Sequence, residues 1–384
     1  MPSTWGGITE KLRLLMQEKS EVIYVVTEFA EKEMNSTGYL WSIFIEEAEK
    51  LGSPVEVISP GAQFANLPKT LRKFVASLVL FCLCLWKIPR GAKVLCGTNP
   101  ASLPLIMSAI KIIKQIQLFV LVHDLFPDNA IPAGFLNSNS AIFRIASKLF
   151  EKAYRSSTGI VVIGRDMRKR LDSKVSGSVP ILYVPNWVPT SKSASEIEPS
   201  KGKDIVVFQY FGNLGRLQGL EYVLDGISLS TAKNARFDFY GSGSIAKVLN
   251  SHPALATDSR VCLYSSVPFV DRNRILQRCD VSLVTLRPGM YGLGVPSKAY
   301  FSVANYKPIV VMGDKGSELE LSIQEHPGIG WFVPAGHPQA FADCIDRICK
   351  LDSFLSAKSG CRDFLVEVHP RTAIPKLLAF VQNT

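Results

Sequence analysis

The sequence has few of the residues on which metal and redox chemistry depend. Its 384 residues include only five histidines, and none has the spacing of a zinc site. The eight cysteines form no C-x-x-C pair, and we interpret all eight as reduced thiols, which favours the cytosol. No D-x-D pair is present to hold a divalent metal ion. We therefore expect a cytoplasmic protein with no metal site and no bound cofactor.

Long apolar runs are also absent. No basic segment followed by an apolar run opens the chain, so no signal peptide is predicted. The most apolar stretch, residues 74–86, has thirteen residues with Ser77 as the only polar one, whereas spanning a bilayer takes about 20. It belongs to a helix expected at residues 71–86. That helix is either a buried core helix or one that lies in a membrane surface, anchored by Trp86 and its basic flanks.

The formal net charge of +10 is unevenly distributed along the chain. Residues 69–174 hold seventeen basic and five acidic residues, whereas residues 1–68 hold five basic and ten acidic residues. This asymmetry predicts an anionic partner for part of the surface. No zinc-finger, RNA-recognition or basic-zipper pattern accompanies the charge, so we expect no nucleic acid. An anionic membrane surface, bound through residues 69–174, fits better.

Short apolar strands alternate with helices along the first half of the chain, which predicts a doubly wound parallel sheet. The expected strands are residues 22–27, 55–58, 94–96, 116–123 and 160–163.

The predicted helix at residues 142–153 is amphipathic. We expect its apolar residues, among them Ile142, Ile145 and Leu149, to face the core, and its basic residues to face solvent. Basic side chains at Arg168, Lys169 and Arg170 extend the same positive surface.

Residues 189–203, PTSKSASEIEPSKGK, are polar, lack apolar periodicity and read as a linker. Strands then recur at residues 205–211, 236–240, 261–264, 281–284, 308–312 and 330–333. The prediction is an α/β protein of two Rossmann-like, doubly wound domains that face a cleft, residues 1–188 and residues 204–369. Ligands of such pairs bind in the cleft, at the carboxyl ends of the strands.

Residues 206–227, VVFQYFGNLGRLQGLEYVLDGI, read as a strand, a glycine-rich turn and a helix. Gly212 and Gly215 allow a tight turn and leave backbone N–H groups open to a ligand. Arg216 follows at the point where a guanidinium group would reach a bound phosphate, and its planar fork suits that partner. The alternative is an ordinary strand-to-helix loop with a surface arginine.

Two further stretches predict ligand-binding loops at the same edge of the sheet. Gly241 opens the first, YGSGS, directly after a predicted strand. The second, RPGMYGLGVPSKAYF at residues 287–301, is a glycine-rich loop that leads into a helix. Ser297 is the expected N-cap of that helix, and Lys298 lies in its first turn. Free N–H groups, the positive helix end and a lysine form an anion site, although a capped helix with a solvated lysine is the alternative.

Together these stretches resemble the retaining glycosyltransferases of family 4, which have the GT-B fold. FGNLGRLQGLE resembles that family's donor-diphosphate loop, and GLGVPSKAYF with ANYKPIV resembles its sugar-and-phosphate helix and the next strand. VHDLFPDNAIPAG resembles the end of the fourth strand of the acceptor domain, and VPNWV resembles the run into the linker. HPGIGWFVPAGHPQAF resembles the stretch before the late helices, which return to the first domain; the resemblance therefore assigns residues 370–384 to it.

The resemblance implies transfer of a sugar from a UDP- or GDP-linked donor to an acceptor, with the anomeric configuration kept. By position it implies catalytic roles for Arg216, Lys298 and His123, with His123 as a hydrogen-bonding group rather than a proton shuttle. Gly38 and Asp124 would lie on the acceptor side. The residues that it assigns to the donor are Gly212, Asn213, Gly215, Gly241, Gly292, Leu293, Gly294, Ser297 and Phe301.

Two departures from the family pattern affect these expectations. The family's third stretch usually carries two glutamates eight positions apart, for the sugar and the ribose, and Leu293 and Phe301 occupy those positions here. The usual lysine shortly after the arginine is replaced by Gln218 and Gly219, and we expect Lys298 to supply the missing charge. We interpret the chain as a divergent but active branch.

We expect the acceptor to be a lipid-linked or small glycan, and the enzyme to work in polysaccharide, glycolipid or glycan assembly at the inner face of a membrane. Two other functions stay open. The loss of both glutamates favours a non-catalytic GT-B subunit that recruits a partner glycosyltransferase to the membrane. A nucleotide-sugar epimerase shares the fold, but it would need several acidic and histidine groups in the cleft, in which this chain is poor.

Overall fold

The computed structural model describes residues 21–28, 35–61, 69–190, 205–351 and 355–384. Most of the expected linker, residues 189–203, lies outside the described residues. The chain divides into two compact units. The first consists of Met1–Pro127, Ser138–Trp187 and Pro370–Thr384, and the second of Asp128–Asn137 and Val188–His369. The short segment Asp128–Asn137 thus groups with the second unit, whereas the sequence placed it in the N-terminal domain.

A six-stranded parallel sheet in the order β2-β1-β3-β4-β5-β6 forms the centre of the first unit. Its strands are β1 (Ile23–Val26), β2 (Val55–Ile58), β3 (Lys93–Cys96), β4 (Gln117–Val122), β5 (Gly159–Val162) and β6 (Ile181–Tyr183). The expected strands are present with shifts of at most one residue at their ends, and β6 was not anticipated. The chain reverses its direction across the sheet between β1 and β3, where a doubly wound sheet opens a crevice.

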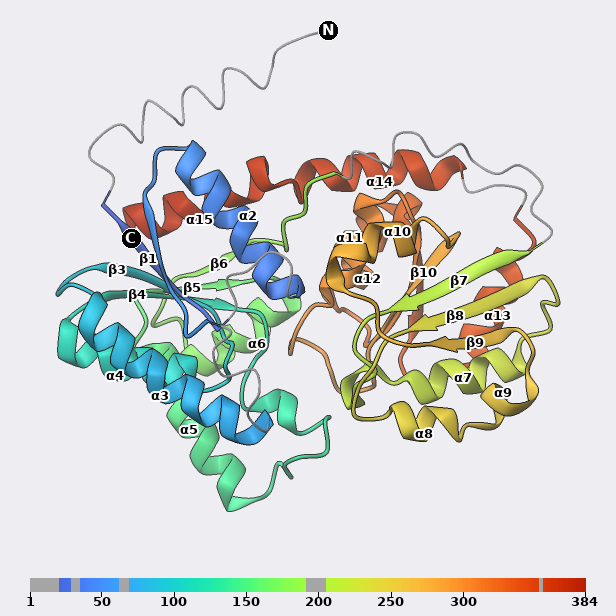
Figure 1. Ribbon diagram of the computed structural model, residues 1–384, viewed down its shortest axis with the longest axis horizontal. Helices are drawn as coiled ribbons and strands as arrows, with labels where there is room; N and C mark the ends of the chain where they lie inside the picture. The colour runs from blue at the N-terminus through green and yellow to red at the C-terminus, as the bar shows by residue number, and fades with distance from the viewer. Residues whose placement is uncertain (1–20, 29–34, 62–68, 191–204, 352–354) are drawn as a thin grey trace, which may run out of the picture. The chain divides into compact units, whose positions relative to one another are not determined.

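The helices of the first unit cover both faces of this sheet. Figure 1 shows α2 (Ser36–Lys50) and α15 (Pro370–Asn383) on one side, and α3 (Lys69–Lys87), α4 (Leu103–Lys114) and α5 (Ala141–Arg155) on the other. Parallel crossovers are right-handed, so the direction in which a connection crosses the sheet decides the face on which its helix lies. The connection through α2 runs from β1 to β2, towards one edge, whereas those through α3, α4 and α5 run towards the edge formed by β6. α6 (Arg165–Val175) packs next to α5.

Helix α3 is neither fully buried nor fully exposed. Its residues Ala76, Leu80 and Cys84 are buried on one side, whereas Phe74 and Trp86 are exposed on the other. The expectation of a simple core helix is therefore wrong for its outward half. No helix among the described residues has the length and apolar character that crossing a bilayer requires.

Helix α5 differs from the expectation in which of its apolar residues are buried. Phe150, Ala153 and Tyr154 pack inward, but Ile142 and Ile145 are more than 60% exposed, and Leu149 is exposed as well. The prediction that these three face the core is wrong. The amphipathic pattern showed that the helix has an apolar stripe, and half of that stripe lies beyond the reach of the helices beside it.

The second unit contains another six-stranded parallel sheet, in the order β12-β11-β10-β7-β8-β9. Its strands are β7 (Val206–Phe211), β8 (Ala235–Tyr240), β9 (Val261–Tyr264), β10 (Val281–Thr285), β11 (Ile309–Gly313) and β12 (Gly330–Pro334). Read from the other edge this is the Rossmann order 3-2-1-4-5-6, whose switch point lies between its first and fourth strands, here β7 and β10. The loops that follow β7 and β10 are those that the sequence singled out.

Helices surround this sheet as well. They are α7 (Leu220–Leu229), α8 (Ala246–Asn250), α9 (Pro253–Thr257), α10 (Arg272–Leu276), α11 (Ser297–Ala304), α12 (Glu318–Glu325), α13 (Pro338–Ile348) and α14 (Leu355–Glu367). α7 and α13 pack against each other.

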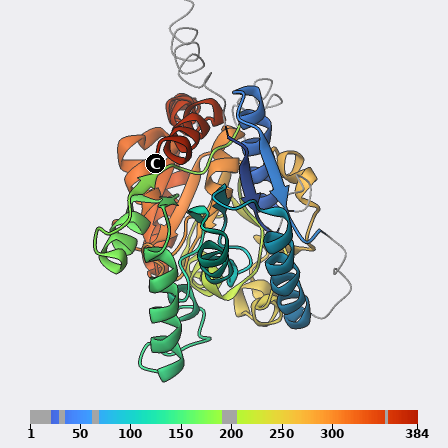
Figure 2. The same ribbon diagram turned by 90° about the vertical axis from the view of Figure 1, so that its left-hand side faces the viewer.

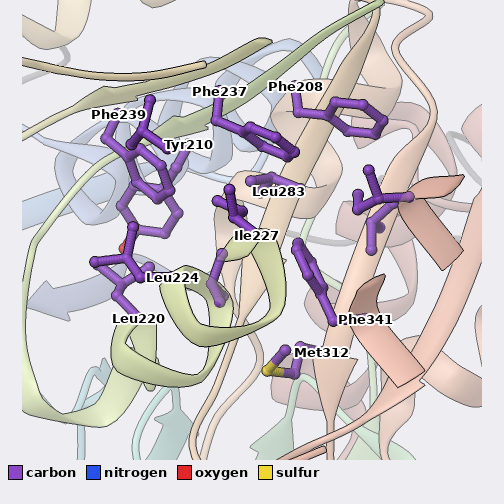
Figure 3. Close-up of a cluster of buried hydrophobic side chains, with 14 of the residues drawn as sticks. Phe208, Tyr210, Leu220, Leu224, Ile227, Phe237, Phe239, Leu283, Met312 and Phe341 are labelled. Atoms are coloured by element: carbon purple, nitrogen blue, oxygen red, sulfur yellow. The ribbon is translucent and has the colours of Figure 1, made fainter. Parts of the chain in front are cut away.

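Stacked aromatic rings form the core beneath the switch point. Phe208 stacks on Phe237 with ring centroids 5.2 Å apart, and Tyr210 stacks on Phe239 at 6.1 Å. Both pairs are directly opposite in the β7–β8 register, so ring packing and strand pairing support the same alignment. Figure 3 shows Leu220, Leu224 and Ile227 of α7 beside these rings, and all are buried. The end of β7, from which the glycine turn starts, is thereby held in place.

Asp346 on α13 fixes the end of α7 through hydrogen bonds. Its carboxylate accepts from the Ser230 hydroxyl (2.6 Å), from the Thr231 backbone N–H (3.1 Å) and from the Ala232 backbone N–H (3.1 Å). Burial raises the pKa of this carboxyl, but the hydrogen bonds outweigh burial and lower the pKa to about 2. Because the folded-state pKa is depressed, the stabilisation is present above the unfolded pKa near 4 and is lost as the pH falls towards 2.

We predict that Asp346→Ala lowers the free energy of unfolding at neutral pH by about 1–3 kcal/mol, because charge-assisted hydrogen bonds are lost. The difference from wild type should shrink below about pH 4, as the wild-type carboxylate protonates. Urea unfolding at several pH values measures both effects. Asp343→Ala is the matched control, since Asp343 is exposed on the same helix and accepts a single hydrogen bond, from Gln339, among the described residues. Equal stabilities of the two variants would contradict the role of Asp346.

Candidate active site

The turn after β7 and the loop after β8 are built against each other. The backbone N–H of Gly212 donates to the Tyr240 carbonyl (2.9 Å), and that of Leu214 donates to the Ser242 carbonyl (2.9 Å). Gly212 has a φ of 138°, which favours glycine. A Cβ atom at Gly241 would overlap the Gly212 carbonyl. Gly241 therefore permits the close approach of the two loops, whether or not it also contacts a ligand.

Arg216 begins a short 3₁₀ turn, Arg216–Gln218, that is fixed by its backbone. Its carbonyl accepts a hydrogen bond from Arg287 Nη1 (3.2 Å), and the Leu217 carbonyl accepts from the Arg287 backbone N–H (2.9 Å). The Arg216 side chain is exposed, and its guanidinium carbon lies 5.4 Å from the centre of the Phe135 ring. The loop after β10 thus holds the backbone of the turn, while the guanidinium group is oriented by an aromatic ring and is open to an anionic ligand.

Lys298, in the first turn of α11, places its ammonium group at the same turn. Its Nζ lies 3.6 Å from the centre of the Tyr210 ring, and a Cβ atom on Gly212 would meet it at 3.4 Å. The Tyr210 hydroxyl donates to the Asn213 carbonyl (2.6 Å), which ties the ring to the glycine turn. No hydrogen bond or ion pair joins Lys298 Nζ to another described residue. Burial lowers the pKa of Lys298 to about 7.

The start of α11 differs from the expectation for Ser297. The N-cap position belongs to Pro296, and Ser297 is the first helical residue. No side-chain oxygen caps this first turn. Ser297 as the N-cap is therefore wrong, because the helix begins one residue earlier than the serine pattern suggested. An uncapped helix end next to a lysine still favours an anion.

Asp314, directly after β11, holds the glycine loop that precedes α11. Its carboxylate accepts hydrogen bonds from the backbone N–H groups of Gly289 (3.3 Å) and Tyr291 (2.7 Å). Gly289 and Gly292 both have positive φ angles, so the loop uses conformations that glycine adopts easily. The sequence reasoning missed Asp314. Its place just after a buried strand, at the edge where the other loops gather, was the available signal.

The two positions at which the family usually has glutamates carry buried apolar side chains. Leu293 is 1% exposed. Phe301 is also buried; its ring packs edge-on against Phe269, and the Arg272 guanidinium lies 5.2 Å from its centre. Neither side chain can accept a hydrogen bond from a sugar. Gly294, between them in sequence, is part of the loop and only partly buried.

His123 and Asp124 lie at the end of β4 in the first unit. Their backbone N–H groups both donate to the Thr98 hydroxyl, at 3.2 Å. Both ring nitrogens of His123 are buried and have no hydrogen-bond partner among the described residues, and the ring lies edge-on to Trp41 with centroids 6.3 Å apart. Burial lowers the pKa of His123 to about 4 and raises that of Asp124 to about 6. The imidazole is therefore neutral at neutral pH, so one ring nitrogen can donate a hydrogen bond and the other can accept one.

Gly38 lies in the first turn of α2. Its N–H donates to the side chain of Asn35, the N-cap, at 2.9 Å. Its place on the acceptor side stays a prediction.

In the second unit the structure thus brings the Gly212–Arg216 turn, the Gly241 loop and the Lys298 end of α11 to one edge of the sheet. Comparison with known sequences identifies the protein family. The profile of the family described as "Glycosyl transferases group 1" matches residues 206–350. A probable glycosyltransferase of Pseudomonas aeruginosa, WbjE, is 36% identical over 369 residues, covering 88% of this chain and 91% of that protein. The chain belongs to the group 1 glycosyltransferases.

Solved structures of glycosyltransferases share the fold along nearly the whole chain. Sucrose-phosphate synthase from Thermosynechococcus elongatus matches with a TM-score of 0.72 at 12% identity, over 94% of this chain and 98% of that one. Anabaena HepE, in complex with UDP and glucose, matches with a TM-score of 0.64 at 13% identity, over 95% and 100%. The lipopolysaccharide outer core galactosyltransferase WaaB gives 0.65 at 14%, over 94% and 99%. The GT-B fold and the family predicted from the sequence are confirmed.

We predict that nucleoside diphosphate binding by this glycosyltransferase weakens as the pH rises above about 7. The bound anion requires the charged form of Lys298, whose pKa is lowered to about 7, so affinity should fall up to about tenfold per pH unit above that value. Calorimetric titration with UDP and GDP between neutral and alkaline pH measures it. Lys298→Met, similar in length and uncharged, should bind weakly and lose this pH dependence. An identical pH profile in the variant would contradict the prediction.

A second prediction concerns Asp314. Asp314→Ala should speed hydrogen exchange of the Tyr291 amide and lower kcat/KM by about tenfold, because the glycine loop loses both side-chain acceptors and misplaced groups are costly. The matched control is Lys315→Ala, an exposed neighbour. Unchanged exchange together with unchanged kinetics would show that Asp314 does not position the loop.

Proposed function

We propose that this glycosyltransferase transfers a sugar from a UDP- or GDP-linked donor, with retention of anomeric configuration, in the assembly of a polysaccharide or lipid-linked glycan. The observation that carries the proposal is the ammonium group of Lys298, held over Tyr210 and against Gly212 without a carboxylate partner among the described residues. A half-buried cation of this kind fits a polyanionic ligand. The names of its relatives agree: HepE was solved with UDP and glucose, and WaaB is described as a lipopolysaccharide galactosyltransferase.

Leaving-group departure is the costly part of the proposed reaction. Negative charge grows on the nucleoside diphosphate as the bond to the anomeric carbon breaks. Lys298, Arg216 and the uncapped N-terminus of α11 are cationic or partly positive groups that oppose this charge, so no metal ion is required in the proposed mechanism. We nominate no carboxylate nucleophile. The proposed role of His123, as a neutral hydrogen-bonding group for the sugar, stays a prediction.

Apolar side chains at Leu293 and Phe301 leave ribose and sugar recognition to other groups. The backbone of the glycine loop is our candidate for the sugar, because Asp314 holds this loop in one conformation through two backbone N–H groups. The same two side chains favour a second candidate function, a non-catalytic subunit that binds a nucleotide sugar and recruits a partner enzyme. Hydrolysis of a panel of nucleotide sugars, with and without a lipid-linked acceptor, separates the two. Binding of a donor without any turnover would favour the non-catalytic subunit.

We also propose that the acceptor is lipid-linked and that residues 69–174 bring the first unit to an anionic membrane. The excess of basic residues in this range supports the proposal.

Arg216→Ala tests the diphosphate assignment. The variant should lose about 10- to 150-fold in kcat/KM, which corresponds to about 1.5–3 kcal/mol for charge-assisted hydrogen bonds to the diphosphate. Steady-state kinetics with the preferred donor measures the loss. Arg278→Ala is the control, since Arg278 is exposed on the same unit and lies outside the proposed site. Wild-type kinetics in Arg216→Ala would rule out the assignment.

A further inference from the structure

Helix α3 presents an apolar stripe to solvent on the side that faces away from the sheet. Leu71, Phe74, Leu78 and Trp86 follow helical spacing, so they line one side of the helix. Trp86 is 79% exposed and Phe74 is 70% exposed. A surface of this kind on a globular protein marks an interaction site.

The two helices beside α3 continue this apolar surface. On α4, Ile112 is 76% exposed and Ile113 is exposed too, and on α5 the exposed residues are Ile142, Ile145 and Leu149. Nine of the sixteen large apolar side chains that are exposed among the described residues lie on these three helices. Such a concentration in a small part of the chain points to one continuous surface rather than to scattered exposed residues.

The three helices form one layer. α4 packs against α3 and against α5, and the right-handed crossovers place all three on the same face of the first sheet. Figure 1 shows them together on the side opposite α2 and α15, and Figure 2 shows the layer from the left-hand side of that view. Their outward sides therefore face the same direction.

Charge on this layer is almost entirely positive. The sequence of α3 contains four basic residues and no acidic one, and that of α4 contains two and none. α5 contains four basic residues and a single acidic one, Glu151, which pairs with Arg155 at 2.8 Å. Arg144, Lys148 and Lys152 of α5 are exposed beside the apolar residues. Exposed apolar side chains among unopposed basic ones suit the boundary of an anionic bilayer.

We propose that the α3–α5 face, defined by these exposed residues of α3, α4 and α5, lies on an anionic lipid surface. The inference rests on the proposed function, because it gives the enzyme access to a lipid-linked acceptor. The apolar side chains enter the boundary of the acyl region, and the basic groups meet lipid phosphates. A second copy of the chain fits poorly, since a two-fold contact would set the same positive helices against each other. The proposed contact is made by surface side chains, and no helix among the described residues is long and apolar enough to cross a bilayer.

Co-sedimentation of the full chain with phosphatidylcholine vesicles of rising phosphatidylglycerol content tests the proposal, at low and at high salt. Wild type should bind increasingly with anionic lipid, and less at high salt. The variant Ile142→Ser/Ile145→Ser/Leu149→Ser should lose at least about tenfold in partitioning at any lipid charge. The variant Arg144→Glu/Lys148→Glu should lose binding mainly at low salt. Matched controls on the second unit, Leu229→Ser/Val270→Ser and Arg278→Glu/Lys350→Glu, should bind as wild type does.

Calorimetric binding of UDP and of GDP in the absence of vesicles is measured on every variant and should not change, which also shows that the variants fold. Vesicle binding equal to wild type in both α5 variants, or no vesicle binding by wild type, would overturn the proposed face. Dimerisation in solution that the α5 variants abolish would overturn it as well, in favour of a second copy. Failure of wild type to bind either UDP or GDP would instead refute the proposed function and leave the vesicle result standing on its own.

Discussion

The ammonium group of Lys298 is held against the Tyr210 ring with no carboxylate partner in the part of the chain that the structure describes, and the proposed anion site of the second unit depends on this contact. Tyr210 belongs to β7, which is central in its sheet, and Lys298 belongs to α11, which begins after the loop from β10. Strands β7 and β10 flank the switch point of the Rossmann order. The contact therefore links the two loops between which such a sheet leaves room for a ligand.

Glycine makes this contact geometrically feasible. A side chain at Gly212 would press on the lysine, and one at Gly241 would press on the Gly212 carbonyl. The aromatic pairs Phe208–Phe237 and Tyr210–Phe239 fix the strands beneath. The ring packing and the glycines together keep the Lys298 ammonium group partly out of water before any ligand binds. This desolvation lowers the pKa of Lys298 and increases the free energy gained when an anion binds.

The sequence was sufficient for the described strands other than β6, for the family and for the glycine loops at the switch point, because these depend on local patterns: apolar runs, and glycine after a strand. It was insufficient where the outcome depends on distant partners. Asp314 reaches backbone groups more than twenty residues away, and no local pattern reports that contact. The outward residues Ile142 and Ile145 of α5 have the same periodicity as core residues, since periodicity shows that a helix has an apolar side but not what covers it. Ser297 was misplaced by one residue, the usual uncertainty of a helix end.

Helix α15 follows the whole second unit in sequence and yet completes the first. Phe380 packs against Phe119, Lys93 Nζ donates to the Gln382 carbonyl (2.6 Å), and the Gln382 side chain donates to Ser53 (2.9 Å). During synthesis the first sheet therefore lacks α15 on one of its faces until the second unit has left the ribosome. The second unit needs the early segment Asp128–Asn137 but no later part of the first. The order of emergence thus lets the second unit close before the first, although most of the first unit precedes it in the chain.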